Sequence, residues 1–148
     1  MDRFEELLRE LGEIIDVPLY PDNHRLCRLN IGDFLHVQLE CDLLKEQLLI
    51  ATFIGEIPPG KFRENILKEA LKDNSDLPHV GTLAYSERNN QLALFNYLPL
   101  SELNGEKIAQ SLEGFIEKAD SWRIALERGL PSPSGPLPSR QGPPFLGL

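Results

Sequence analysis

Hydrophobic residues at the start of the chain recur with the spacing of one face of a helix. The apolar side chains between residues 4 and 15 fall on a single stripe: Phe4, Leu7, Leu8, Leu11, Ile14 and Ile15. Asp2 followed by Glu5 has the spacing of a capping box, and Pro18 and Pro21 end the pattern. The pattern therefore predicts an amphipathic helix at the start of the chain.

Three strands are predicted after this helix. Apolar and polar residues alternate over Cys27–Ile31 and again over Leu35–Cys41. A two-residue turn between these strands would set their apolar faces against each other, so a three-residue connection, Gly32–Phe34, is preferred. The third strand, Gln47–Ile54, is apolar on both faces, as expected of a central or doubly covered strand.

A second helix and a hairpin are predicted in the middle of the chain. Pro58–Gly60 breaks the chain before a helix from Lys61 to about Lys72, with apolar positions at Phe62, Ile66, Leu67, Ala70 and Leu71. The strands Gly81–Ser86 and Gln91–Leu98 form a hairpin around Asn89–Asn90, because two asparagines accept the positive φ of a tight turn. That turn would pair Tyr85 with Leu94, and Ala84 with Phe95.

The last helix is the longest. Asn104 is the expected N-cap, with Leu103 stapled onto Ile108, and Gly129 lies where a left-handed C-cap belongs. Its apolar stripe includes Phe115 and Trp122, which are assigned to the core. The predicted order is α-β-β-β-α-β-β-α, which indicates an α+β fold: a mainly antiparallel five-stranded sheet with three helices.

Proline separates the end of the chain from its body. Of the 148 residues, the last 18 hold six of the twelve prolines, three glycines and three serines. We therefore expect one α+β domain over residues 1–130 and a tail over residues 131–148 without fixed structure. The only charge in the tail is Arg140, so the body carries 14 basic against 23 acidic residues.

This acidity and the hydropathy pattern exclude several classes of protein. A body so negative repels nucleic acid and anionic membranes. The longest apolar run, Leu48–Ile54, has seven residues, too few for a membrane span, and the first six residues lack the layout of a secretory signal. We therefore expect a cytoplasmic protein in which Cys27 and Cys41 are reduced thiols.

Motifs for enzymatic chemistry are missing from the sequence. It contains no G-x-S-x-G, no phosphate-binding loop, no H-E-x-x-H and no dinucleotide fingerprint. A metal site built from His24, Cys27, His36 and Cys41 is disfavoured, because Cys27 and His36 point to opposite faces of the predicted sheet. The paired carboxylates are interpreted as solvated surface, so no catalytic residue, metal or cofactor is expected.

The apolar content exceeds what three helices and five short strands need. Apolar residues on both faces of the third strand, together with the stripe of the first helix, either pack entirely in the core or form an interface with a partner. Composition alone leaves these two interpretations equally weighted.

Several motifs together resemble the class I type III secretion chaperones, the Tir-chaperone family. The resemblance covers Phe4 to Leu130 and rests on Phe4-x-x-Leu7-Leu8-x-x-Leu11-Gly12, Cys27-x-Leu29-x-Ile31, Leu35-x-Val37-x-Leu39-Glu40, Ile66-Leu67-Lys68-Glu69-Ala70, Gly81-Thr82-Leu83, Leu92-Ala93-Leu94, Leu98-Pro99-Leu100 and the Phe115 to Trp122-Arg123 spacing. Leu71 departs from the pattern, since members often carry Asn directly after the alanine. The tail is also longer than the family pattern needs.

The resemblance implies a bacterial cytoplasmic homodimer that binds the N-terminal chaperone-binding segment of secreted effectors and keeps them soluble and ready for export. It implies the secretion ATPase or export apparatus as further contacts. The residues expected to bind the effector are Phe4, Leu8, Leu11, Leu29, Ile31 and Leu35. Those expected at the dimer interface are Phe62, Ile66, Leu67, Ala70, Leu83 and Tyr85. The alternative is a non-enzymatic regulatory adaptor that binds proteins through the proline-rich tail or a sheet edge.

Overall fold

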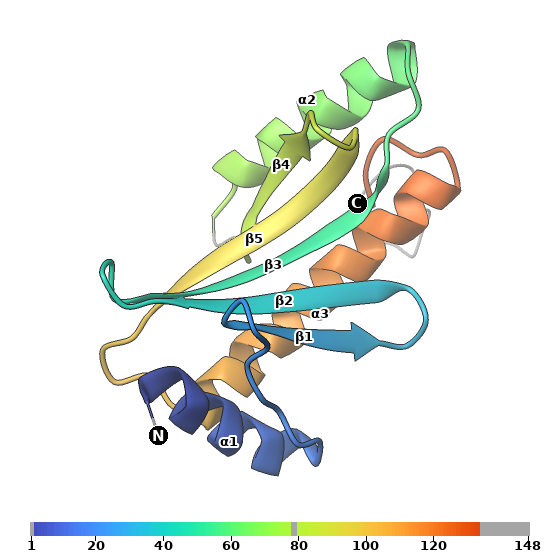
Figure 1. Ribbon diagram of the computed structural model, residues 1–148. Helices are drawn as coiled ribbons and strands as arrows, with labels where there is room; N and C mark the ends of the chain where they lie inside the picture. The colour runs from blue at the N-terminus through green and yellow to red at the C-terminus, as the bar shows by residue number, and fades with distance from the viewer. Residues whose placement is uncertain (1, 78–79, 134–148) are drawn as a thin grey trace, which may run out of the picture.

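The computed structural model describes residues 2–77 and 80–133, and it contains the predicted elements in the predicted order (Figure 1). The helices and strands are α1 (Arg3–Ile15), β1 (Leu26–Ile31), β2 (Leu35–Asp42), β3 (Gln47–Glu56), α2 (Lys61–Ser75), β4 (Thr82–Ser86), β5 (Gln91–Pro99) and α3 (Gly105–Glu127). The α+β class and the order α-β-β-β-α-β-β-α are confirmed. The expected tail lies outside the described residues from residue 134 onward.

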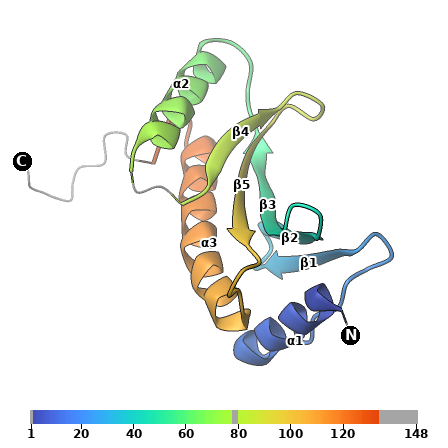
Figure 2. The same cartoon turned by 90° about the vertical axis from the view of Figure 1, so that its left-hand side faces the viewer.

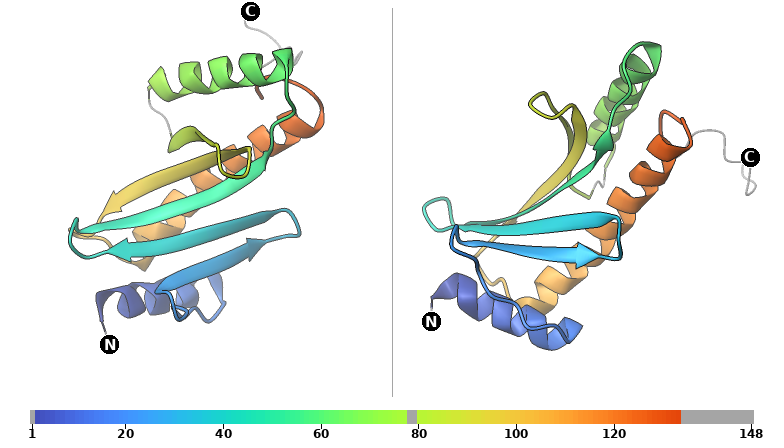
Figure 3. Two further views of the ribbon diagram at one scale, coloured as in Figure 1. Left: turned by 45° about the horizontal axis from the view of Figure 1, so that its top comes forward. Right: turned by 45° about the vertical axis from the view of Figure 1, so that its right-hand side comes forward.

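The five strands form one antiparallel sheet in the order β1-β2-β3-β5-β4. Helix α3 runs along one side of the sheet, with α1 beyond the β1 end and α2 beyond the β4 end (Figures 2 and 3). The central position of β3 is confirmed, since it pairs with β2 on one side and β5 on the other. The two edges of the sheet are therefore β1 and β4.

The connection between β1 and β2 has the predicted three residues. Ile31 pairs with Leu35 and Leu29 with Val37, so the apolar side chains of both strands share one face. Gly32 adopts φ 60°, the left-handed conformation that a three-residue connection needs. The hydrophobic pattern was sufficient here, because slipping one strand by a residue would turn all its apolar side chains into solvent.

The predicted pairing of the β4–β5 hairpin is wrong by two residues. Tyr85 pairs with Leu92 rather than Leu94, and Ala84 with Ala93 rather than Phe95, so the loop has four residues, 87–90. Within it, the Asn90 side-chain amide donates to the main-chain carbonyl of Ile57, and the main-chain carbonyl of Asn90 accepts from the Ile57 amide. These bonds hold Asn90 beside the end of β3 and lengthen the loop, while the shift of two keeps each side chain on its face.

The predicted helix ends are largely confirmed. Asp2 and Glu5 form the capping box of α1, and Asn104 caps α3 by accepting from the Lys107 amide. At the end of α3 the Gly129 amide donates to the Leu126 carbonyl and the Leu130 amide to that of Ala125, with Gly129 at φ 72°. Helix α2 continues to Ser75, three residues beyond the predicted Lys72.

The core lies between the sheet and the helices. It takes in Phe115 and Trp122 as predicted, together with the inner faces of α1 and of the strands. The stripe of α1 does not stay buried to its end, because Ile14 and Ile15 are exposed. On β3, Leu48, Ile50 and Ile54 are buried, whereas Phe53 on the opposite face is 45% exposed. One face of the central strand is therefore left without a covering layer.

Candidate partner-binding surfaces

Thirteen large hydrophobic side chains are exposed among the described residues, and most of them cluster. They lie at the end of α1 and in the segment after it, on the open face of the sheet, along α2 and β4, and at two hairpin tips: Ile14, Ile15, Val17, Tyr20, Phe53, Tyr97, Leu71, Leu77, Val80, Tyr85, Phe34, Leu43 and Leu44. Single exposed apolar residues are ordinary, but adjoining ones indicate surfaces for partners.

A groove of about 760 Å³ runs between α1 and residues 17–21. Helix α1 ends at Asp16, whose φ is 61°, and the Val17 amide then donates to the Gly12 carbonyl. Only glycine fits at position 12, because a Cβ there would lie 2.6 Å from the Val17 carbonyl oxygen. This tight return places Tyr20, which is 77% exposed, in the groove wall opposite the helix.

The helical wall of this groove is acidic. Glu5, Glu13 and Asp16 line it together with Arg9, and the Arg9 guanidinium is paired with Glu13 at 3.1 Å. The other wall is apolar, formed by Val17, Leu19, Tyr20 and the two prolines between residues 18 and 21. Such a groove suits an extended segment that alternates apolar side chains with basic ones.

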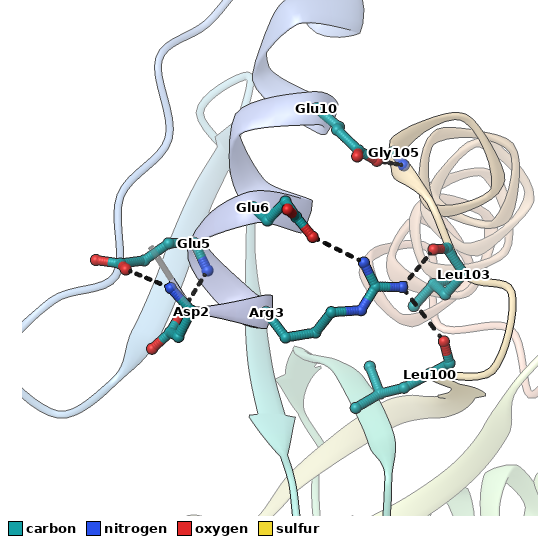
Figure 4. A network of polar contacts seen from close by, with 8 residues as sticks. All are labelled: Asp2, Arg3, Glu5, Glu6, Glu10, Leu100, Leu103 and Gly105. Atoms are coloured by element: carbon teal, nitrogen blue, oxygen red, sulfur yellow. Dashed lines mark hydrogen bonds and ion pairs between the residues drawn. The ribbon is translucent and has the colours of Figure 1, made fainter.

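Polar contacts fix α1 in place against the start of α3 (Figure 4). The Arg3 guanidinium donates to the carbonyls of Leu103, at 2.7 Å, and Leu100, at 3.4 Å. The Gly105 amide donates to the Glu10 carboxylate at 2.8 Å, where the two helices meet closely. Because these bonds join residues about 100 positions apart, they hold the groove's helical wall against the body of the protein.

The β4 edge of the sheet is capped at Leu83. The Asn74 side-chain amide donates to the Leu83 carbonyl at 2.9 Å and its oxygen accepts from the Leu83 amide at 2.8 Å. Lys118 donates to the carbonyl of Gly81 at 3.4 Å, just before the strand. These contacts occupy the outward main-chain groups of Leu83, so another strand could pair on this edge only with those of Tyr85.

The β1 edge is open beyond its first residue. Asp22 bonds to both outward main-chain groups of Leu26. A side-chain oxygen of Asp22 accepts from the Leu26 amide, and the main-chain amide of Asp22 donates to the Leu26 carbonyl. Alternate residues of an antiparallel strand direct their main-chain groups to the same side, so those of Arg28 and Asn30 also point outward. Within the described residues no further segment pairs with this side of β1. The edge can therefore accept one more strand.

The uncovered face of the sheet carries an aromatic patch. The Phe95 and Tyr97 rings meet edge to face, with centroids 5.8 Å apart, and Phe53 stands on the neighbouring strand. A shallow groove of about 450 Å³ lies among these rings and polar side chains that include His36 and Arg88. This face is a second surface suited to a partner.

Most residues predicted to bind an effector are buried in the single chain. Phe4, Leu8 and Leu11 are in the core, as are Leu29 and Leu35, while Ile31 is half-buried. They support the groove and the sheet from beneath. The groove wall itself, with Val17 and Tyr20, was not predicted, although the prolines at 18 and 21 signalled an extended segment.

The residues predicted at the dimer interface divide in the same way. Ile66, Ala70 and Leu83 are buried within the chain. Phe62, Leu67 and Tyr85 remain partly accessible. Two exposed neighbours on α2 and in the segment after it, Leu71 and Leu77, extend this surface.

The two cysteines are free thiols with little reactivity. Burial raises the pKa of Cys27, with a smaller contribution from Asp22, and burial also raises the pKa of Cys41. Among the described residues no three His, Cys, Asp or Glu side chains are grouped to hold a metal ion, and this includes His24, Cys27, His36 and Cys41. His36 instead bonds to the Asn30 side chain at 2.7 Å. No helix in the described ranges is long and apolar enough to cross a membrane.

Solved structures share this fold at low sequence identity. A chain of the HopA1–SchA chaperone–effector complex gives one such match, with a TM-score of 0.67 at 22% identity over 80% of this chain and 91% of that one. The ExsC–ExsE complex gives 0.67 at 19% identity over 85% and 97%. The Yersinia pestis type III secretion chaperone SycH, solved with a fragment of YscM2, gives 0.66 at 18% identity over 83% and 98%.

Comparison with sequence families identifies the protein more specifically than these similarities of fold do. No curated protein sequence matches the chain significantly. However, residues 6–123 match the family model described as the Tir chaperone protein (CesT) family, and this range spans every strand, α2, and most of α1 and α3. The chain therefore belongs to the Tir chaperone protein (CesT) family.

Proposed function

We propose that the protein is a non-enzymatic bacterial chaperone that acts in the cytoplasm. It binds the N-terminal chaperone-binding segment of type III secreted effectors and keeps that segment extended and soluble until export. The observation that carries the proposal is the groove beside α1, acidic on one wall and apolar on the other, together with the outward main-chain groups of β1, with which no further described segment pairs. Membership of the chaperone family supports it, as do the chaperone complexes that share the fold.

The binding mode combines the groove with strand addition. Apolar side chains of the effector segment enter the groove between α1 and Tyr20. The main chain of the segment pairs with the outward groups of Arg28 and Asn30 on β1. The buried residues predicted earlier, such as Leu11 and Leu29, hold α1 and β1 in position for this contact.

Charge substitution in the groove tests the proposal. Each secreted protein of the source organism is represented by its first hundred or so residues and co-expressed with the chaperone. We expect Tyr20→Asp to abolish the solubility that the native chaperone confers on its effector segment. Leu44→Asp is the matched control, because Leu44 is 97% exposed at a hairpin tip outside the groove. If both variants bind equally well, the groove is not the binding site.

Strand addition has a separate test at Asn30. Asn30→Pro removes an outward N–H that β2 does not use, whereas Asn30→Ala retains it. We expect the proline variant to lose effector affinity and the alanine variant to bind like the native protein, with circular dichroism confirming that both are folded. Equal affinities would remove strand addition from the binding mode.

We also propose that the protein is a homodimer joined through α2 and β4. The accessible residues Phe62, Leu67 and Tyr85 and the exposed Leu71 support this location, since adjoining accessible apolar side chains indicate a surface for a partner. Sedimentation should give a dimer that Leu71→Glu dissociates. A dimer that resists Leu71→Glu but dissociates in Tyr97→Glu would place the interface on the aromatic face instead.

A further inference from the structure

A cleft of about 570 Å³ separates the C-terminal half of α2 from the middle of α3. Asp73 of α2 and Lys118 of α3 bridge it with an ion pair of 2.5 Å. The chain's one tryptophan, Trp122, lines the cleft together with Val80. Figure 2 shows α2 and α3 as separate helices on the same side of β4 and β5. Trp122 and Val80 thus give the cleft an apolar part between charged rims.

The end of the described chain leads into this cleft. The left-handed turn at Gly129 reverses the chain after α3, and the Leu130 amide bonds back to the Ala125 carbonyl. Ser132 is then only 5% exposed, and Pro133 lines the cleft with Ser121 and Trp122. Residues 130–133 have thus returned alongside α3 by two helical turns. The last described residue, Pro133, is therefore part of the cleft lining.

The next residues have the chemistry that the cleft accepts. Residues 134–140 read Ser-Gly-Pro-Leu-Pro-Ser-Arg, in which prolines flank Leu137. Proline-rich sequences in general favour the polyproline II conformation, so packing one of them on an aromatic ring costs little conformational entropy. At about 3.1 Å per residue, the seven residues after Pro133 span roughly 22 Å, enough to reach the far rim.

The charges of the segment and the rim are complementary. Arg140 is the only charged residue of the tail. The rim carries Glu69, Asp73, Asp76 and Glu117 against two lysines, Lys72 and Lys118, which are already paired with Glu69 and Asp73. The rim is therefore net negative, and a guanidinium arriving from the cleft meets carboxylates.

We propose that residues 134–140 dock in the α2–α3 cleft of their own chain and fasten α2 to α3. Leu137 is the apolar anchor beside Trp122 and Val80, and Arg140 pairs with the acidic rim. The tail is then an intramolecular strap that sets the position of α2, independently of whether an effector is bound. This gives the proline-rich tail a role within the fold rather than as a contact for other proteins.

The fluorescence emission of Trp122 is sensitive to whether the α2–α3 cleft is occupied. We compare the full chain with a chain that ends at Pro133, after circular dichroism has established that both are folded. We expect truncation to shift the Trp122 emission to longer wavelength and to speed amide exchange in residues 69–76 several-fold. A synthetic peptide of residues 134–148 added to the truncated chain should restore both signals with saturation. Identical emission and exchange in the two chains would overturn the proposal.

Point variants in the full chain keep the test specific. Leu137→Asp should reproduce the truncated signals, whereas Leu148→Asp, the matched control at the end of the tail, should leave them unchanged. If the two variants act alike, Leu137 is not the anchor and the proposed docking is wrong. The native signals should not change on dilution; if they do, the strap comes from a second copy and the docking is not within one chain.

Discussion

Replacing Gly105 by alanine tests how closely α1 and α3 must approach. A Cβ at this buried position would lie 2.6 Å from the main-chain carbon of Glu10 and 2.7 Å from the Leu11 nitrogen. Ordinary contacts begin at 3.4 Å, so the helices must separate by roughly 0.8 Å. Two of the three nearest atoms belong to the backbone and the third is the Glu10 Cβ, which is fixed to it, so no side-chain rotation can make room. The change also stretches the 2.8 Å bond from the Gly105 amide to the Glu10 carboxylate.

The size of the effect follows from these two losses. Overpacking a core costs about 1–3 kcal/mol, and weakening a buried hydrogen bond to a carboxylate costs about 1.5–3 kcal/mol at most. Alanine recovers up to about 1 kcal/mol of helix propensity. We therefore expect the free energy of unfolding to fall by about 2–4 kcal/mol. With a urea m-value of about 2 kcal/mol/M, the unfolding midpoint would move down by about 1–2 M.

Gly114→Ala is the matched control in the same helix. A Cβ there meets only the Val80 methyl groups, at 3.6 and 3.8 Å, which is ordinary contact. The same substitution should therefore stabilise the protein by about 0.5–1 kcal/mol through helix propensity alone. Both midpoints are measured by urea unfolding followed by circular dichroism. Stabilisation by both substitutions would refute the close approach of α1 and α3 at Gly105.

Three further predictions concern other parts of the fold. Asn74→Ala leaves the Leu83 main chain unpaired, so we expect a loss of about 1–3 kcal/mol and concentration-dependent aggregation in light scattering as the β4 edge opens. Arg123→Met removes a guanidinium 4.3 Å above the Phe34 ring and should cost about 1–2 kcal/mol in a urea titration, with faster amide exchange in the β1–β2 hairpin. Hydrogen bonds from the amides of Leu26 and His24 lower the pKa of Asp22, with Arg28 contributing. A lowered folded pKa stabilises the protein above the unfolded value of about 3.9, and this stabilisation is lost as the pH falls through the folded pKa. Asp22→Asn should reduce the change in the urea unfolding midpoint between pH 5 and pH 2. An unchanged pH dependence would contradict a stabilising role for the Asp22 carboxylate.

The sequence predicted correctly those features that depend on interactions between residues close together in the chain. The capping box at Asp2 and Glu5 and the cap at Asn104 depend on residues three positions apart, and both are present. The β1–β2 register followed from the alternation of apolar residues, since only one connection length keeps them on one face. Where a distant contact intervened, prediction failed: the bonds between Asn90 and Ile57 lengthen the β4–β5 loop.

The surfaces for partners were the least predictable part. The apolar stripe of α1 contains both Phe4 and Ile14, and nothing in the spacing of the residues distinguishes them. Phe4 is 2% exposed in the core, whereas Ile14 is 51% exposed. The capping of the β4 edge at Leu83 likewise depends on Asn74, a residue that the sequence shows only as part of a polar run.

The sequence by itself determined the class of fold, the order of its elements, most of their ends and the family, because periodicity, capping and turn preferences act over a few residues. Only the tertiary structure decided which apolar residues are left over for partners and which edge of the sheet is open. These properties depend on what packs against each face and edge, and that packing joins residues as far apart as Arg3 and Leu103.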